Sequence, residues 1–254
     1  ELVEQIELVE RHFFFEPHGN YVLVGVRQAG KSYLLYQRMK QLIAKGHQME
    51  ELVYINFDDE RIANIKTEEM DLIIQAHQAL SSTQPILFLD EIQNITGWEH
   101  FARRLANQKY QVYITGSNAK MLSRDIATTL CGRYWVVNVY PYSFDEFLEA
   151  HAVQLKKNWE FSKQSAEVQR LFQEYFYYGG FPELTSVIDK RGWITGIFQK
   201  IFFSDVIARN GVRNEEALRM TIRKLADSVK QPMAYNRISN LVCSTGVKTN
   251  AQSV

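Results

Sequence analysis

The sequence predicts an α/β protein in which a parallel β-sheet flanked by helices is followed by a helical region. Short apolar runs alternate with amphipathic stretches as far as Pro141, and these runs are apolar almost throughout, which is typical of strands buried on both faces. Beyond Pro141 the apolar residues recur only at helical spacing. With 46% hydrophobic and 23% charged residues, the chain of 254 residues can bury a core, which excludes the disordered, collagen-like and mini-protein classes.

The first half of the chain alternates strands with helices. The predicted strands are residues 21–24, 52–57, 86–89, 111–115 and 134–139. A helix is expected over 34–43, because its apolar residues share one face, and another over 98–105. Thr67 is expected to cap a third helix, since Glu68 and Glu69 would lie in its first turn, where the helix dipole favours anions.

The second half is predicted to be helical. Ser143 and Glu146 have the spacing of a capping box, which predicts the start of a helix. Further amphipathic stripes cover residues 168–176, 194–202 and 218–229. We therefore expect three parts: a core with an N-terminal helix (1–150), a helical lid (151–230) and a C-terminal segment (231–254).

One glycine-rich segment carries a specific chemical signal. It runs Gly25-Val-Arg-Gln-Ala-Gly30-Lys31-Ser32 and matches the Walker A pattern G-x-x-x-x-G-K-[ST] between a predicted strand and a predicted helix. Such a P-loop wraps main-chain N–H groups around phosphates, and the helix start adds its dipole. Lys31 would reach the β- and γ-phosphates, and the Ser32 hydroxyl would bind Mg²⁺. The alternative is a glycine turn with a solvated lysine.

A second signal is Asp90-Glu91 at the end of the apolar run 86–89. In the Walker B pattern, Asp90 would hold Mg²⁺ through water and Glu91 would polarise the attacking water. Alone the pattern is weak, because strand ends often carry acids, but after a P-loop it is strong. Another strand–helix unit separates the two motifs, so the Asp90 strand is not expected to be the direct successor of the P-loop strand.

Polar residues at two other strand ends could face the same site. Asn118, or less favourably Ser117, could report on the γ-phosphate, and the alternative is a turn with an N-cap. Asp58 and Asp59 follow the second strand, where a solvated turn is the favoured interpretation.

An arginine near the γ-phosphate would stabilise charge in the transition state, and it could come from this chain or from a neighbouring subunit. Arg133 is the better candidate and Arg124 the weaker one. For each of them the alternative is a surface cation.

The C-terminal segment has the outline of a helix-turn-helix. Ile238, Leu241 and Val242 share a helical face, Gly246 makes a turn, and Thr249 could cap a second helix. An ordinary helical hairpin is the alternative. From residue 189 to 254 the chain carries 11 basic and 5 acidic residues, a net charge of +6, whereas residues 1–188 carry −6. This asymmetry marks a candidate surface for DNA or for a protein partner.

The motif order resembles that of the bacterial and archaeal AAA-like ATPases close to the archaeal ATPase and STAND clades. The resemblance is carried by the P-loop and by Phe-Leu-Asp-Glu-Ile-Gln, Thr-Gly-Ser-Asn, Gly-Arg, Pro-Tyr-Ser-Phe-Asp-Glu-Phe and Tyr-Gly-Gly-Phe-Pro-Glu. It implies an ASCE-type P-loop core, a helical lid, a winged helix and then a nuclease-like domain, so we expect a piece of a longer protein. It also implies that Gly180 and Pro182 touch the nucleotide, as a Gly-x-Pro motif does in STAND proteins. Many family members have Thr where Ser32 stands.

Together these features predict an ATPase that uses Mg²⁺. The nucleotide-binding residues are expected to be Gly25, Val26, Arg27, Gln28, Ala29, Gly30, Lys31, Ser32, Tyr33, Gly180 and Pro182. The catalytic residues are expected to be Glu91, Lys31, Asn118 and Arg133, and the metal ligands Ser32 and Asp90.

Two other functions stay open, a nucleotide-dependent switch and a DNA-binding module with little turnover; a small-molecule kinase is the less favoured enzyme. The two cysteines fit a reducing cytoplasm, and no apolar run approaches the ~18 residues of a membrane span. A homo-oligomer is a further expectation.

Overall fold

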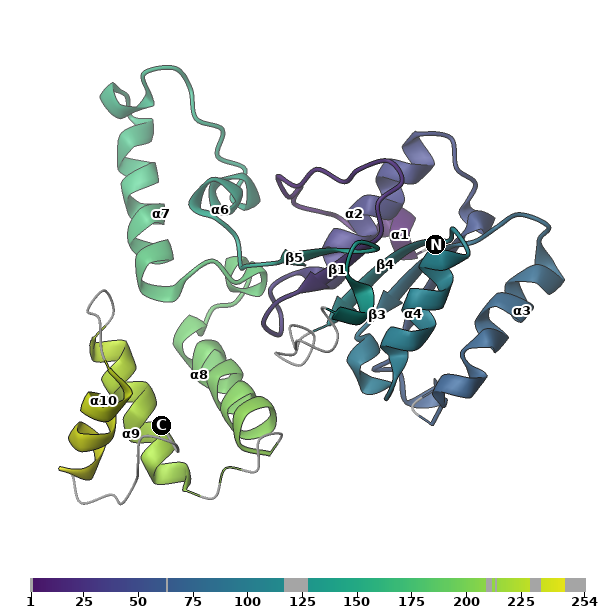
Figure 1. The fold of residues 1–254 in the computed structure, drawn as a ribbon. Coiled ribbons are helices and arrows are strands. Elements are labelled where there is room, and N and C mark those ends of the chain that lie inside the picture. Colours follow the sequence, from purple (N-terminus) through teal and green to yellow (C-terminus); the bar gives the residue numbers. More distant parts are fainter. Residues whose placement is uncertain are drawn as a thin grey trace. The chain divides into compact units, whose positions relative to one another are not determined.

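The computed structural model describes residues 2–62, 64–116, 128–208, 212, 214–228 and 234–244 (Figure 1). The chain divides into two compact units, residues 1–194 and 195–254. The division falls inside helix α8 (Lys190–Lys200), and the predicted boundaries at 150 and 230 stay predictions.

The first unit is built on a parallel sheet of five strands in the order β2-β3-β4-β1-β5. The strands are β1 (Tyr21–Val24), β2 (Leu52–Asn56), β3 (Ile86–Asp90), β4 (Gln111–Gly116) and β5 (Trp135–Asn138). This confirms the predicted α/β class. In sequence, β2 and α3 lie between the P-loop strand β1 and the Asp90 strand β3, as predicted, and in the sheet β4 lies between β1 and β3.

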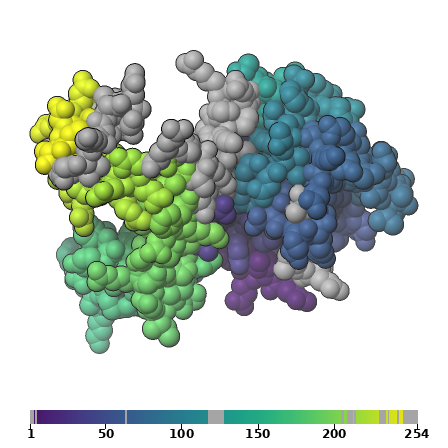
Figure 2. Space-filling view, turned by 90° about the horizontal axis from the view of Figure 1, so that it is seen from below, coloured from purple at the N-terminus to yellow at the C-terminus, as the bar shows by residue number. Residues whose placement is uncertain are grey.

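Helices cover both faces of the sheet (Figure 1). Alternate residues of a strand point to opposite faces, so Tyr21 and Leu23 pack toward α2 (Lys31–Ala44), and Val22 and Val24 pack on the other side. On that side lie α3 (Asp71–Leu80) and α4 (Trp98–Asn107). Both helices reach the surface in the blue region of Figure 2. The short helix α1 (Leu2–Gln5) adds Val3 to the α2 side.

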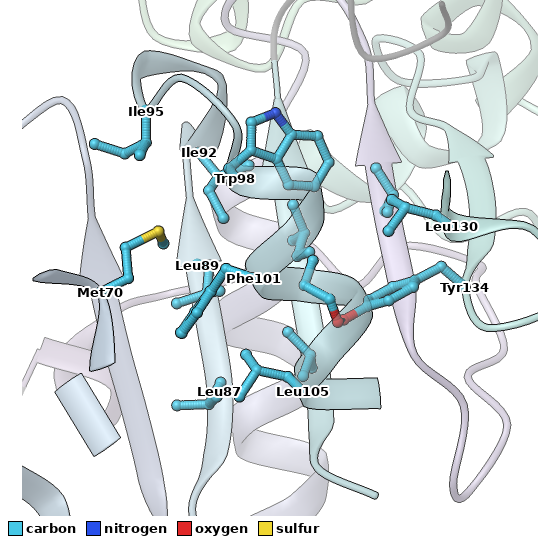
Figure 3. Close-up of a cluster of buried hydrophobic side chains, with 14 of the residues drawn as sticks. Met70, Leu87, Leu89, Ile92, Ile95, Trp98, Phe101, Leu105, Leu130 and Tyr134 are labelled. Carbon is cyan, nitrogen blue, oxygen red and sulfur yellow. The ribbon is translucent and has the colours of Figure 1, made fainter. Parts of the chain in front are cut away.

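The cluster between the sheet and α4 is the larger part of the core. Figure 3 shows Phe101 and Leu105 of α4 beside Leu87 and Leu89 of β3, with Trp98 of α4 at the upper end of the same cluster. All five side chains are at most 3% exposed. Burial of this kind is worth roughly 1.5–3 kcal/mol for each large apolar side chain, and it fixes β3 and therefore the position of its carboxyl end.

Two local predictions are wrong. Thr67 does not cap a helix: residues Thr67–Glu69 form a 3₁₀ turn whose first residue donates to Thr96 O, and α3 begins at Asp71. Strand β5 is not buried on both faces. It lies at the edge of the sheet, and its Trp135 is 62% exposed.

Helices α6 (Phe144–Ala150) and α7 (Gln164–Tyr178) complete the first unit and pack through Phe147, Leu148 and Leu171. The predicted capping box at the start of α6 is confirmed. Glu146 N donates to Ser143 Oγ (3.2 Å), and Ser143 N donates to Glu146 Oε2 (2.9 Å).

In the second unit, the C-terminal part of α8 continues into a π-helix (Ile201–Ala208), followed by α9 (Glu215–Asp227) and α10 (Tyr235–Cys243). Ala217 of α9 packs with Ile238 and Val242 of α10. The remainder of the predicted helix-turn-helix, from Gly246 to Thr249, lies outside the described residues.

Candidate functional site

The P-loop joins the carboxyl end of β1 to the start of α2. Gly30 occupies the N-cap position of α2 with φ 92° and ψ 21°, a left-handed conformation that glycine adopts without steric cost. Gly25 is required for a different reason: a Cβ there would collide with the main-chain oxygen of Val139. The two glycines therefore fix the path of the β1–α2 loop: Gly25 lets it pass close to Val139, just after β5, and Gly30 lets it turn into α2.

Lys31 is buried at the start of α2, with 4% of its surface exposed. Its Nζ donates to Val26 O (3.1 Å) and lies 3.7 Å from Glu91 Oε1. Burial lowers the pKa of Lys31, and the carboxylates of Glu91 and Asp90 oppose this effect. The ammonium group thus lies between its own loop and the acidic end of β3. Ser32, the next residue, is half-buried.

Asp90 ends β3 and is 1% exposed. Its two carboxylate oxygens accept hydrogen bonds from the strands on either side: Tyr54 OH of β2 donates to Oδ2 (2.7 Å), and Thr115 Oγ1 of β4 donates to Oδ1. Burial, and then the charge of Asp90, raise the pKa of Tyr54. The carboxylate is therefore held by neutral donors in a fixed orientation.

Glu91 follows in a left-handed conformation, with φ 52° and ψ 40°, which is uncommon for a residue other than glycine. Its main-chain N donates to Thr115 Oγ1 (3.0 Å), and its Oε2 accepts from Gln93 Nε2. This conformation turns the chain sharply after β3, and the Glu91 carboxylate reaches within 3.7 Å of Lys31 Nζ.

Arg11 joins the segment before β1 to this site. Its guanidinium donates to Glu146 Oε1 (2.7 Å), to Ala29 O in the P-loop (3.2 Å) and to Tyr140 O (2.9 Å). It also lies over the ring of Tyr142, 5.2 Å from the ring centre. Beside these contacts a cavity of about 460 Å³ is lined by Arg11, Phe13, Leu34, Asn138, Tyr142 and Glu146, among others.

The structure brings Pro182 to the P-loop, and Gly180 packs against Tyr142. Pro182 Cγ lies 3.6 Å from the position that a Cβ on Gly30 would take. Gly180 O accepts from Tyr142 N (2.7 Å), and a side chain at Gly180 would collide with Tyr142 O. The segment thus follows the end of α7 and also packs against Gly30 and Tyr142, and its contact with a nucleotide stays a prediction.

The structure does not bring Arg133 to the P-loop of its own chain. Arg133 precedes β5, which runs parallel to β1, so it lies at the amino ends of the strands whereas Lys31 lies at their carboxyl ends. Its Nε donates to Asn107 Oδ1 (2.7 Å), and it lines a hollow of about 630 Å³ there. Arg133 therefore lies at the opposite end of the sheet from the P-loop of its own chain.

The two acidic residues that follow β2 belong to a solvated turn. Asp59 is held by Arg61, whose hydrogen bonds lower the pKa of Asp59 to about 2, and Asp58 is exposed, in agreement with a solvated turn. Asn118, Ser117 and Arg124 lie outside the described residues.

Sequence reasoning missed Arg11, Tyr54 and Gln93 as parts of the site, and it passed over Thr115. Of these four, only Thr115 could have been predicted from the sequence, because it lies at a strand end, two residues before the candidate Ser117. Among the described residues, no group of three or more His, Cys, Asp or Glu could hold a metal ion. No described helix is long and apolar enough to cross a membrane.

Comparison with known proteins gives the family. Residues 18–148 match the AAA domain family, so the chain belongs to this family of P-loop proteins. Residues 169–252 match a domain of unknown function. An uncharacterized protein of Methanocaldococcus jannaschii is 30% identical over the whole chain, and one of Haemophilus influenzae is 35% identical over 92% of it. The chain spans 57% of the length of each relative.

Two solved structures are similar at low identity. AMPPCP-bound DnaA from Aquifex aeolicus is 14% identical with a TM-score of 0.38, covering 90% of this chain and 82% of that one. Cdc6p from Pyrobaculum aerophilum is 14% identical with a TM-score of 0.41, covering 94% and 78%.

Proposed function

We propose that the chain binds ATP together with Mg²⁺ and hydrolyses the ATP. The observation that carries the proposal is the meeting of three groups at the carboxyl end of the sheet: the P-loop with Lys31, the buried Asp90, and Glu91 within 3.7 Å of Lys31 Nζ. Membership of the AAA family supports nucleotide binding.

The P-loop is proposed to bind the phosphates. The residues proposed to surround the phosphates are Gly25, Val26, Arg27, Gln28, Ala29, Gly30, Ser32 and Tyr33. The N–H groups of Gly25 and Ala29 donate to Gly116 O and Val26 O, so the proposed donors to phosphate are among the remaining main-chain N–H groups of the loop. Phosphates at the start of α2 also gain from the helix dipole. The Lys31 ammonium group, which contacts Val26 O and Glu91 in this structure, is proposed to bind the β- and γ-phosphates when ATP is present.

The residues present fit a magnesium ion. Ser32 offers a hydroxyl oxygen and Asp90 a buried carboxylate, and Mg²⁺ prefers such hard oxygen ligands. Ser32 would bind it directly and Asp90 through water. When bound, Mg²⁺ neutralises charge that develops on the β- and γ-phosphate oxygens.

Glu91 is the proposed general base. Its carboxylate lies at the carboxyl end of the sheet, and Gln93 donates to it, so its orientation is defined before substrate arrives. A base in this position accepts the proton of the attacking water. Asn118, which follows β4 in the sequence, is also proposed to contact the γ-phosphate.

The cavity beside Arg11 is proposed to hold the base of the nucleotide. It lies next to the P-loop, because Arg11 donates to Ala29 O, and Leu34 is one turn beyond Lys31. Pro182 borders the loop at Gly30, and Pro182 and Gly180 are proposed to contact the bound nucleotide.

Mutants of the P-loop and of the base test this function. Lys31→Ala should weaken ATP binding more than about tenfold. Glu91→Gln should bind ATP normally and lose about 100-fold or more in turnover. Lys45→Ala, at the exposed end of the same helix, is the matched control and should leave both unchanged. Unchanged turnover in Glu91→Gln would reject the assignment of the base.

Arg133 is proposed to act on the nucleotide of a neighbouring copy, which requires a homo-oligomer. Arg133→Ala and Lys31→Ala proteins should each be inactive alone. If Arg133 acts between subunits, mixing them should restore part of the turnover, since one subunit supplies the loop and the other the arginine. No recovery on mixing would reject this role.

The second unit is proposed to couple the nucleotide state to a DNA or protein partner in the cytoplasm. Two observations support this proposal: the net positive charge of the second unit and the packing of α9 on α10. Stimulation of turnover by double-stranded DNA would favour a DNA-dependent machine, and slow release of ADP would favour a switch. DNA binding that does not weaken with salt would argue against phosphate contacts.

A further inference from the structure

The carboxylate of Asp90 is held from both sides by hydroxyl groups. Tyr54 of β2 and Thr115 of β4 each donate to one of its oxygens. Among the described residues, no lysine or arginine forms an ion pair with Asp90, which is 1% exposed. A buried carboxylate needs such donors, and two hydroxyls occupy about two of its four lone-pair positions. The rest stay available for water bound to a metal ion.

A second hydrogen bond extends this arrangement to the P-loop helix. Tyr36 OH lies 3.0 Å from Tyr54 OH, and the two rings pack with their centres 5.4 Å apart. Tyr36 is on α2, four residues and so about one turn beyond Ser32. Each phenol has one proton to donate: Tyr36 donates to Tyr54 OH, and Tyr54 donates to Asp90.

We propose that Tyr54 is a positioning residue for the magnesium ion, an inference that rests on the proposed function. Its hydroxyl keeps the Asp90 carboxylate in one orientation, and Tyr36 fixes the start of α2, with Ser32, relative to the end of β3. Tyr54 itself touches neither the ion nor the nucleotide. It acts on the spacing of the two magnesium ligands, which come from different elements of the fold.

The test measures the dependence of nucleotide binding on Mg²⁺ rather than turnover. A non-hydrolysable ATP analogue is titrated into the protein at Mg²⁺ concentrations from the micromolar to the millimolar range, and also in EDTA. In Tyr54→Phe the Mg²⁺ concentration for half-maximal binding should rise about tenfold, because a hydrogen bond to a charged group is lost. Affinity in EDTA should stay within about twofold of the native protein, a pattern that mere loss of packing would not produce.

Two more variants complete the experiment. Tyr36→Phe removes the hydrogen bond from Tyr36 to Tyr54, which is one step further from the ion, and should raise the Mg²⁺ requirement about two- to threefold. Tyr134→Phe is the matched control, because its buried hydroxyl donates to Ala102 O (2.7 Å), away from Asp90, and its Mg²⁺ requirement should equal that of the native protein.

An unchanged Mg²⁺ requirement in Tyr54→Phe overturns the proposal, as does an equal loss of affinity with and without Mg²⁺. If Tyr54→Phe does not fold, an unchanged requirement in Tyr36→Phe overturns it instead. If the native protein binds the analogue in neither condition, the proposed function fails and takes this inference with it. Native binding that depends on Mg²⁺, with unchanged variants, refutes only the role of Tyr54.

Discussion

Replacing Arg11 with methionine would test how the segment before β1 is tied to the nucleotide site. The Arg11 guanidinium contacts three separate segments: Glu146 at the start of α6, Ala29 in the P-loop and Tyr140 after β5. Its side chain is 12% exposed and that of Glu146 is 8% exposed. Methionine keeps much of the volume and removes all three hydrogen bonds, so the variant isolates the polar contacts.

The expected loss of stability follows from this burial. Removing one partner of a buried ion pair costs about 3–5 kcal/mol, because the other charge stays behind uncompensated. Glu146 keeps two main-chain donors, Ser143 N at 2.9 Å and His12 N at 3.4 Å, so we expect the lower end of this range, about 3 kcal/mol. For a unit of this size, that loss lowers the melting temperature by about 6–12 °C.

Thermal unfolding followed by circular dichroism measures this shift. A double-mutant cycle with Glu146→Gln should give a coupling energy of about 1 kcal/mol or more, because the residues are in direct contact. Arg61→Met is the control, since Arg61 pairs with Asp59 on the open surface and should leave the melting temperature unchanged. A fall of less than about 2 °C for Arg11→Met, or additive effects in the cycle, would refute the reasoning.

Three further predictions concern stability. Gly180→Ala should cost about 1–3 kcal/mol in chemical denaturation, because the new Cβ collides with Tyr142 O; an unchanged midpoint would contradict the close approach. Arg38 is 1% exposed and donates to Tyr113 OH, with no ion-pair partner among the described residues. Arg38→Met should therefore change the free energy of unfolding by less than about 1 kcal/mol, and a loss above about 3 kcal/mol would show that the buried charge is needed. Burial raises the pKa of Glu146, but the hydrogen bonds it accepts outweigh this and leave its pKa below the ordinary 4.5. The stability it contributes is complete above that value and is lost as the pH falls through the lower folded-state pKa, so Glu146→Gln should flatten this part of the stability–pH curve.

The parts of the site that could be predicted from the sequence are those whose chemistry is local. Gly25, Gly30 and Lys31 are close in sequence, and the same short segment contains the reason for their spacing. Asp90 and Glu91 could be predicted because an apolar run must end where the chain leaves the sheet. The sheet itself followed from the same alternation of apolar runs with helical stripes.

Contacts between distant residues could not be predicted in this way. Tyr54 and Asp90 are 36 residues apart, and their hydrogen bond depends on the register of β2 on β3. Arg11 and Glu146 are 135 residues apart. A strand tyrosine and an arginine in an amphipathic segment have ordinary explanations, surface or core packing, so neither indicates its partner.

The errors have physical reasons as well. Trp135 is exposed on β5, which lies at the edge of the sheet, and an apolar run does not tell an edge strand from a central one. Thr67 has a cap-forming side chain, but a tertiary contact with Thr96 O takes its hydroxyl. The Arg133 prediction is not among these errors: the sequence left open whether it acts in its own chain or in a neighbour, and strand direction places it at the opposite end of the sheet from its own P-loop.

If Glu91 is the base, as proposed, its backbone conformation costs stability at the residue that carries the chemistry. A left-handed conformation costs about 1–2 kcal/mol for a residue with a Cβ, and glycine or asparagine would adopt it more readily. Glu91→Gly should therefore relax the turn after β3 while it removes the carboxylate. A chain optimised only to stay folded would have no reason to place glutamate there. The fold tolerates a local weakness at the point where β3, Thr115 and Lys31 together determine the position of one acidic side chain.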